Sequence, residues 1–420
     1  MNEILLYVLG ILVLVLGLAI SIGLHEFGHL IPAKLFDVKV PHWAVGFGPK
    51  LFAKKIGETE YSIRAIPLGG FITMIGMFPP AKADKPDSKR WFGNVIAQSR
   101  EAHSEHMVPG DETRTLYSKP AWQRIIIMLG GPTVNLILGL LLISTALSGV
   151  GVMTQGTKID AVIECQEQMT NPEDSCTADS IRTPAALAGL KSGDVVLRVD
   201  GKTVNVAEPF LSAVTAKPLA SHEVVVQRGQ TELTLNVFPA EAKIGTEVRT
   251  YVGLRMEYIR YQLSLGESVS YGWNATMQTF GFISQFPQQV YSAVYSTFTG
   301  QPRATDSAIS VVGIGQVAGQ VASADGDGLD KVLSTLMLLG SLNLALFAFN
   351  MIPLPPLDGG HVAGGLYEYL KRGAYRVLGK KDPGPVDTAL MAPVAQFMFL
   401  VLLLAGLLMI MVDFINPITF

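Results

Sequence analysis

The sequence predicts a polytopic α-helical membrane protein with four transmembrane helices, a membrane-associated β-hairpin or sheet, and one inserted extracytoplasmic domain. Charged residues make up 16% of the 420 residues, against about 25% in average soluble proteins. Four apolar stretches are long enough to cross a bilayer core, and a polar segment of domain size separates the second from the third. The four stretches are residues 4–31, 125–152, 332–357 and 391–412.

The first apolar stretch ends in a metal-binding pattern. Residues 4–24 carry no charge and would form a helix of about 31 Å. His25 and His29 then share one helix face, with Glu26 beside the first. In zinc peptidases such a pair binds the metal and the glutamate acts as general base. Because carboxylates in membrane helices are costly and usually functional, we predict this site within segment 1–36. The alternative is two interfacial histidines with a snorkelling glutamate.

Positive charges predict the orientation. Segment 34–121 carries 13 Lys or Arg and segment 371–390 carries five, whereas 149–330 carries 12 against 19 acidic residues. By the positive-inside rule, the first two segments face the cytoplasm. The N-terminus, the 153–330 region and the C-terminus are then expected outside. The net charge of −3 gives no indication of a nucleic-acid partner.

Segment 37–120 is predicted to hold a cytoplasmic, membrane-associated β region and a mobile loop. Thr59–Ile66 and Phe71–Ile75 have strand-like composition with partial alternation. We expect them to form a hairpin, because Pro67 and the glycines after it turn the chain. The polar stretch Pro79–Ser118, with its prolines and mixed charges, is predicted to be the mobile loop.

A third zinc ligand is expected in the third apolar stretch, segment 331–372. Residues 353–356 include three prolines, which cannot continue a helix. Irregular backbone at membrane depth is tolerated only where it is buried in protein or lines a wet cavity. Asp358 follows this break, and binding zinc would compensate for burying its carboxylate. The alternative is a helix-terminal aspartate in a turn.

Several motifs together resemble the site-2 protease family of intramembrane zinc metalloproteases. The branch that fits best is the RseP-like one with an inserted PDZ domain, and two further elements look most like its actinobacterial members. The family motifs are HEFGH at 25–29, VGFGP at 45–49, IPLGGF at 66–71, GPTVN at 131–135 and NMIPLPPLDGGH at 350–361. The two actinobacterial elements are ISVVG at 309–313 and NPI at 416–418.

The resemblance implies one zinc ion per chain. His25, His29 and Asp358 would hold the metal, and Glu26 would activate water. The remaining histidines have no matching partners and are predicted to be solvated loop residues: His42, His103, His106 and His222.

The resemblance also implies substrate contacts around the zinc. Asn343 and Asn350 could hold the substrate backbone or the oxyanion, or they could form hydrogen bonds between helices. Pro353 and Pro355 lie in the broken segment and are candidate contacts as well. His361 could support the zinc site, or it could be a turn histidine near the interface.

The predicted hairpin gains a role from the same resemblance. Family members are thought to place this sheet in the membrane beside the zinc, where its free edge could pair with an extended substrate. Gly70, Phe71 and Thr73 are then candidate substrate contacts. The alternative is an ordinary cytoplasmic hairpin.

Segment 157–258 resembles a bacterial PDZ domain. We predict a short helix ended by Gly189, a tight turn at Asp200 and Gly201, and strands at Val224–Gln227 and Leu233–Phe238. Such a domain could exclude substrates with large outer domains, or it could bind peptide ends by strand addition.

The two cysteines lie in this outer region, where an oxidising compartment permits a disulfide between Cys165 and Cys176. The alternative is two free thiols. Segment 264–330 is predicted to be an interfacial helix, interrupted at Pro287, and a linker; a packed core helix competes with this interpretation. Segments 121–152 and 388–414 are the second and fourth predicted transmembrane helices.

Regulated intramembrane proteolysis is the activity that the resemblance implies. The substrates would be single-pass proteins of the bacterial cytoplasmic membrane, such as anti-sigma factors or signal-peptide remnants, with the lipid bilayer as the surrounding partner. The alternative is a membrane metal transporter or zinc sensor, which would need several ligands along a path or repeated halves.

Overall fold

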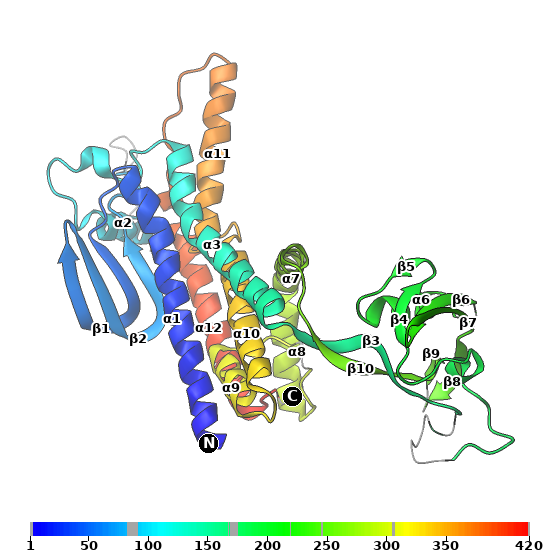
Figure 1. The fold of residues 1–420 in the computed structure, drawn as a ribbon. Coiled ribbons are helices and arrows are strands. Elements are labelled where there is room, and N and C mark those ends of the chain that lie inside the picture. The colour runs from blue at the N-terminus through cyan, green and yellow to red at the C-terminus, as the bar shows by residue number, and fades with distance from the viewer. Residues whose placement is uncertain are drawn as a thin grey trace. The chain divides into compact units, whose positions relative to one another are not determined.

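The computed structural model describes residues 3–81, 91–166, 168, 175–218, 220–244, 247–304 and 307–418 (Figure 1). The chain forms two compact units. One, which we call the helical unit, contains residues 1–149 and 264–420. The other, the inserted unit, contains residues 150–263.

Among the described residues, four helices of the helical unit are long and apolar enough to cross a membrane. They carry the four apolar stretches of the sequence. These helices are α1 (Glu3–Leu35), α3 (Ala121–Ser144, continued by a π-helical turn to Val150), α10 (Gly328–Asn350) and α12 (Ala392–Ile415, preceded by a 3₁₀ turn at Thr388–Met391).

Backbone contact joins α1 and α3. A Cβ atom on Gly130 would lie 1.9 Å from the carbonyl oxygen of Gly28, and one on Gly28 would lie 2.4 Å from that of Gly130. No residue larger than glycine fits here without shifting the helices, which is the usual way that membrane helices approach closely. This crossing brings the middle of α3 against the HExxH turn of α1.

The third predicted span is two helices. α10 ends at Asn350 and α11 (Asp358–Val377) begins with the predicted zinc ligand. A Cβ atom on Gly359 would lie 2.3 Å from the carbonyl oxygen of Ile352. The proline-containing turn therefore packs directly on the start of α11 and places Asp358.

Strands β1 (His42–Ile56) and β2 (Thr59–Thr73) form a sheet beside α1 (Figure 1). The predicted hairpin between Thr59–Ile66 and Phe71–Ile75 is wrong. Both parts of β2 pair with residues 42–45 of β1, which lie between them. The other half of β1, residues 52–56, pairs with the first half of β2. Residues 70–73 therefore form one edge of the sheet.

Glycines explain why β1 escaped prediction. Gly46 and Gly48 have φ angles of 88° and 82°, a region that favours glycine. A Cβ atom on Gly46 would also lie 2.7 Å from the carbonyl oxygen of Ile66. The strand bends at these positions, which interrupt the alternation that identifies a strand in a sequence.

The predicted mobile loop contains regular structure. It includes α2 (Trp91–Ser104) and a 3₁₀ turn at Glu112–Arg114. Residues 82–90 lie outside the described part of the chain. Arg114 donates to both carboxylate oxygens of Glu58 at 2.8 and 2.9 Å, and these bonds hold the pKa of Glu58 below its usual value. This segment is therefore fastened to the turn between β1 and β2.

Three helices occupy the predicted interfacial segment: α7 (Leu265–Ser284), α8 (Phe286–Thr299) and α9 (Val311–Ser323). The interruption at Pro287 is confirmed, because this proline stands in the first turn of α8. Small buried residues on α7, such as Gly272, face α3, while Trp273 beside it is exposed. The helices thus combine a packed face with an exposed aromatic face.

The inserted unit is built on a sheet of order β10-β3-β4-β6-β7, with β5 beside β4 and a separate β8-β9 pair. A core that includes Ile159, Phe210 and Val224 holds it together. Its elements are β3 (Val152–Val162), α5 (Pro184–Leu187), β4 (Val195–Val199), β5 (Lys202–Thr203), α6 (Glu208–Ala216), β6 (His222–Arg228), β7 (Thr231–Val237), β8 (Ala240–Ile244), β9 (Glu247–Tyr251) and β10 (Leu254–Tyr261).

The predicted turns of this unit are confirmed. Gly189 follows α5 with a φ of 75°, and Asp200 and Gly201 have φ angles of 48° and 78°. The interpretation of His222 as a solvated loop residue is wrong, because it is 1% exposed at the start of β6. Its Nδ1 lies 2.8 Å from Asp200 Oδ2. A disulfide joins Cys165 to Cys176, with 5.9 Å between the Cα atoms.

His42 was also predicted to be a solvated loop residue, and this is wrong as well. It is half-buried as the first residue of β1. Its ring lies 5.0 Å from that of His106.

Candidate metal centre

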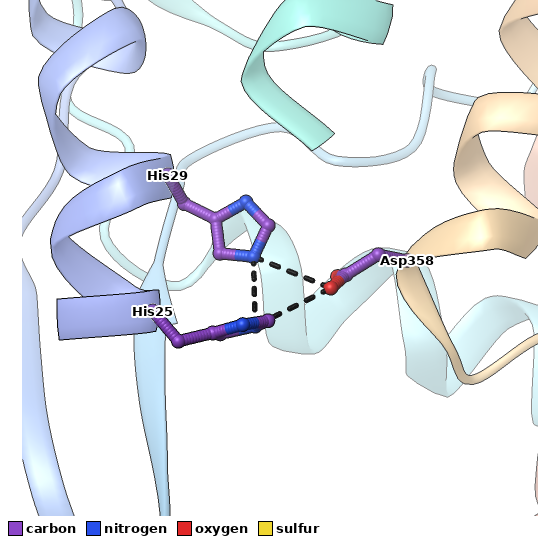
Figure 2. A group of neighbouring side chains, drawn as sticks. All are labelled: His25, His29 and Asp358. Atoms are coloured by element: carbon purple, nitrogen blue, oxygen red, sulfur yellow. Dashed lines mark hydrogen bonds and ion pairs between the residues drawn. The ribbon is translucent and has the colours of Figure 1, made fainter. Parts of the chain in front are cut away.

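Two imidazoles and one carboxylate meet in the helical unit. His25 and His29 stand one turn apart on α1, and Asp358 reaches them from the first turn of α11 (Figure 2). The two Nε2 atoms lie 3.2 Å apart, and each lies 3.4 Å from Asp358 Oδ2. These three are the only group of potential metal ligands of this kind among the described residues.

The spacing of the three atoms suits a zinc ion. Ligand bonds of about 2.0–2.2 Å in tetrahedral geometry imply separations of about 3.3–3.6 Å between ligand atoms. The three separations of 3.2, 3.4 and 3.4 Å are close to this range. Three protein ligands would leave the fourth position open, as catalytic zinc sites do.

The hydrogen bonds of the imidazoles support the same conclusion. His29 Nδ1 lies 2.8 Å from the carbonyl oxygen of Ile127, and His25 Nδ1 contacts Asn135 Oδ1. Both partners are acceptors, so each Nδ1 carries the proton and each Nε2 presents a lone pair. Asp358 Oδ2 is buried and has no hydrogen-bond partner. Three electron-rich atoms therefore converge, and a cation satisfies all of them.

Asn135 belongs to the site although it was not among the predicted site residues. It donates from Nδ2 to Asn343 Oδ1 at 3.0 Å, and Asn343 in turn donates to Ser21 Oγ at 3.0 Å and to the carbonyl oxygen of Leu339 at 2.8 Å. Asn135 and Asn343 are fully buried. This chain of amides spans α3, α10 and α1 and ends on His25. The GPTVN motif was the signal that could have identified it.

Gly131 leaves room for the imidazoles. A Cβ atom at this position of α3 would lie 2.3 Å from His29 Nε2 and 2.7 Å from His25 Nε2. Any side chain here would occupy the space beside the nitrogen atoms that face Asp358.

Glu26 is 8% exposed and packs against the edge of the sheet. A Cβ atom on Gly70 would lie 3.0 Å from Glu26 Cγ and 2.8 Å from Ile22 Cγ2. The edge segment 70–73 therefore lies against α1 at the predicted general base. Thr73 pairs with His42, and the Phe71 ring lies 6.2 Å from that of Phe47.

The remaining predicted contacts lie outside the ligand cluster. Asn350 Nδ2 donates to the carbonyl oxygen of Leu346 at 3.0 Å. Pro353, Pro355 and His361 line a cavity of about 930 Å³ that none of the three ligand residues lines. Asn343 forms hydrogen bonds with residues of α1 and α3, as expected if it joins helices rather than contacting substrate.

Comparisons with known proteins agree with this geometry. A family model described as "Peptidase family M50" matches residues 13–381. The zinc metalloprotease Rip1 of Mycobacterium tuberculosis is 30% identical over 98% of this chain and 99% of its own length. The zinc metalloprotease RasP of Bacillus licheniformis is 28% identical over 80% of this chain and 85% of its own.

Solved structures also match part of the chain. The HtrA3 PDZ domain bound to a phage-derived ligand covers 24% of this chain and 91% of its own, at 19% identity and a TM-score of 0.14.

Proposed function

The chain belongs to peptidase family M50, and on this premise we propose that it is an intramembrane zinc metalloprotease. It hydrolyses peptide bonds in the transmembrane segments of single-pass membrane proteins. The observation that supports this most strongly is the meeting of His25, His29 and Asp358. The two histidines lie on α1, which is long and apolar enough to cross a bilayer, and Asp358 begins α11 after the turn that follows another such helix, α10.

His25, His29 and Asp358 would hold one zinc ion per chain. When bound there, zinc would supply Lewis-acid chemistry toward a water molecule and the scissile carbonyl at neutral pH. Glu26 accepts the proton of the attacking water on its carboxylate and returns it to the leaving amine. Asn135 keeps the His25 ring oriented through its contact with Nδ1.

The substrate binds as an extended strand on the edge of the β1–β2 sheet. A helical substrate hides its scissile bond, because its backbone groups are already paired. Residues 70–73 pair with β1 on one side only among the described strands, and Gly70 packs against Glu26. Strand addition here would present an unwound segment to the catalytic carboxylate. Gly70, Phe71 and Thr73 contribute mainly backbone to this contact.

Asn350 contacts the substrate, through its backbone or through the oxyanion that forms during hydrolysis. Asn343 instead supports the zinc ligand His25 by way of Asn135, since its amide already forms hydrogen bonds with Asn135, Ser21 and Leu339. Pro353, Pro355 and His361 form the wall of the adjoining cavity.

The protein is a multi-pass membrane protein, and we place it in the bacterial cytoplasmic membrane. The N-terminus, the inserted unit and the C-terminus lie outside, following the distribution of Lys and Arg. The inserted unit, with its predicted PDZ fold and its disulfide, restricts access by substrates with large outer domains. The substrates are single-pass proteins such as anti-sigma factors or signal-peptide remnants.

Metal removal tests the assignment. Purified protein is reconstituted in liposomes with a single-pass substrate, and cleavage is followed before and after chelation. We expect zinc content near one per chain, loss of cleavage on chelation, recovery on adding zinc back, and a cut within the transmembrane segment. Undiminished cleavage by protein shown to be free of zinc would contradict the proposal.

The hydrogen-bonded amides of Asn135 and Asn343 lead to a separate prediction. Replacing Asn135 with Ala removes the acceptor for His25 Nδ1, so zinc affinity should fall by about 10–100-fold. Competition against a chromophoric chelator measures this directly. Asn274→Ala is the matched control, since this exposed residue of α7 lies outside the site. Equal affinities for wild type and Asn135→Ala would remove Asn135 from the site.

A further inference from the structure

We infer that the cavity lined by Pro353, Pro355 and His361 is a specificity pocket, which binds an apolar stretch of the substrate on the cytoplasmic side of the scissile bond. This inference rests on the proposed function and extends it to the substrate residues beyond the cut. The cavity, about 930 Å³ in volume, lies in the helical unit among α2, α11, α12 and the turn after β2. It is at the upper end of the size range of ligand pockets, about 300–1,000 Å³.

The cavity adjoins the metal centre through one shared loop. Pro353, Pro355 and Gly360 all line it, and Gly360 stands two residues after the ligand Asp358. The loop that carries the third ligand is therefore also a wall of the cavity. An occupant would touch the segment that positions the carboxylate.

The edge segment leads to the same cavity. Met77 and Phe78 line it, and they follow Thr73, the last residue of β2, within five positions. Five extended residues cover at most about 17 Å. A substrate strand paired with residues 70–73 would reach the cavity within a few residues of the catalytic Glu26.

A second, smaller pocket lies at the opposite end of the edge segment. It measures about 320 Å³ and is lined by Pro67 of β2, Leu14 of α1, Val311 of α9 and Phe414 of α12. Pockets at both ends of residues 67–78 suit an extended peptide that continues past the metal centre in both directions.

The chemistry of the larger cavity selects for uncharged residues. Its walls include Val95, Ala363 and Phe399, with a few polar groups among them. Its acidic lining residue, Asp387, is paired with Arg100 at 2.6 Å. An apolar substrate segment gains from burial here, whereas an acidic one loses its hydration and meets no lysine or arginine among the described lining residues.

The α12 wall has room to receive a peptide. The buried residues of α12 lie at its two ends, Ala392 and Pro393 at one and Met409, Val412 and Asp413 at the other. Between them, residues 394–408 include no buried side chain. The half-buried residues of this stretch follow one face of the helix (Ala395, Met398, Leu402, Ala405 and Leu408), so the middle of α12 packs only partly against protein and on that face alone.

The test combines a filled cavity with two substrates. Ala395, on the lining face of α12, is replaced with Trp, and Val394→Trp, an exposed neighbour outside the lining, is the control. The substrates differ only in carrying Leu or Asp three to five residues from the mapped cut, on its cytoplasmic side. Wild type should prefer the Leu substrate in kcat/KM by roughly tenfold or more.

Filling the cavity should remove that preference. Ala395→Trp should raise KM for the Leu substrate by roughly tenfold, with zinc content and turnover of the Asp substrate unchanged, while Val394→Trp behaves as wild type. Ala102→Trp, on the opposite α2 wall, should do the same if Ala395→Trp does not fold. Equal effects on both substrates, or no effect on either, would overturn the inference. Because wild type cleaves in both of those cases, the proposed function would stand.

Discussion

Glu26→Gln is expected to lower the rate of peptide-bond cleavage by about 10²–10⁴-fold while one zinc ion stays bound per chain. The amide keeps the size of the carboxylate but cannot accept a proton from water at neutral pH. The three ligand atoms come from other residues, so the metal centre should remain intact. The loss should appear in kcat rather than in the affinity for substrate, because the proton transfer occurs only in the transition state.

Single-turnover cleavage with excess enzyme measures this effect without interference from product release. Zinc content by mass spectrometry is determined on the same preparation. Glu60→Gln, a carboxyl-to-amide change on the neighbouring sheet, is the control and should retain activity. If Glu26→Gln cleaves at the wild-type rate with zinc bound, another group must act as the base.

Gly131→Ala is expected to abolish zinc binding and with it all cleavage. The added methyl carbon would lie 2.3 Å from His29 Nε2 and 2.7 Å from His25 Nε2, well inside van der Waals contact. Both rings are held from behind by hydrogen bonds of their Nδ1 atoms, so they cannot retreat without losing those bonds. The nitrogen atoms should then no longer converge with Asp358 on one ion.

Zinc stoichiometry after exhaustive dialysis is the direct measurement, with an expected fall from about one per chain to near zero. Gly281→Ala is the matched control, because this helical glycine of α7 has open space where the Cβ would stand. Thermal unfolding in detergent separates loss of the site from loss of the fold. Full zinc occupancy in a folded Gly131→Ala protein would show that α3 does not press on the site as described.

Local patterns in the sequence account for the membrane class and for the ligands of the metal centre. The four apolar stretches predicted helices that the structure contains, since a long apolar run has few alternatives in a bilayer. His25 and His29 had to share a face, because residues four apart lie one above the other on any α-helix. Asp358 stood out because prolines break the helix before it, and a buried carboxylate there needs compensation.

Strand order and the support of the metal centre could not be predicted in this way. The sequence around residues 59–75 allowed a simple hairpin, but residues 42–45 of β1 lie between the two halves of β2. Gly46 and Gly48 allow β1 to bend into this arrangement, but a glycine in a sequence does not by itself indicate such a bend. The helix α2 was also missed. Its large apolar residues, Trp91, Phe92, Val95 and Ile96, stand in its first two turns, and the rest of the helix is mostly polar, so the segment as a whole has the composition of a loop.

What the sequence determined by itself is the chemistry available: a membrane-embedded chain that offers two imidazoles, a glutamate and an aspartate. Only the tertiary structure decided which residues hold that chemistry in place. Asn135 contacts His25 across 110 positions and Asn343 across 208, and Gly131 meets both histidines at a helix crossing. Periodicity reports on neighbours within a few residues, whereas these contacts depend on how whole helices pack, so the motif at 131–135 marks Gly131 and Asn135 but not the residues that they meet.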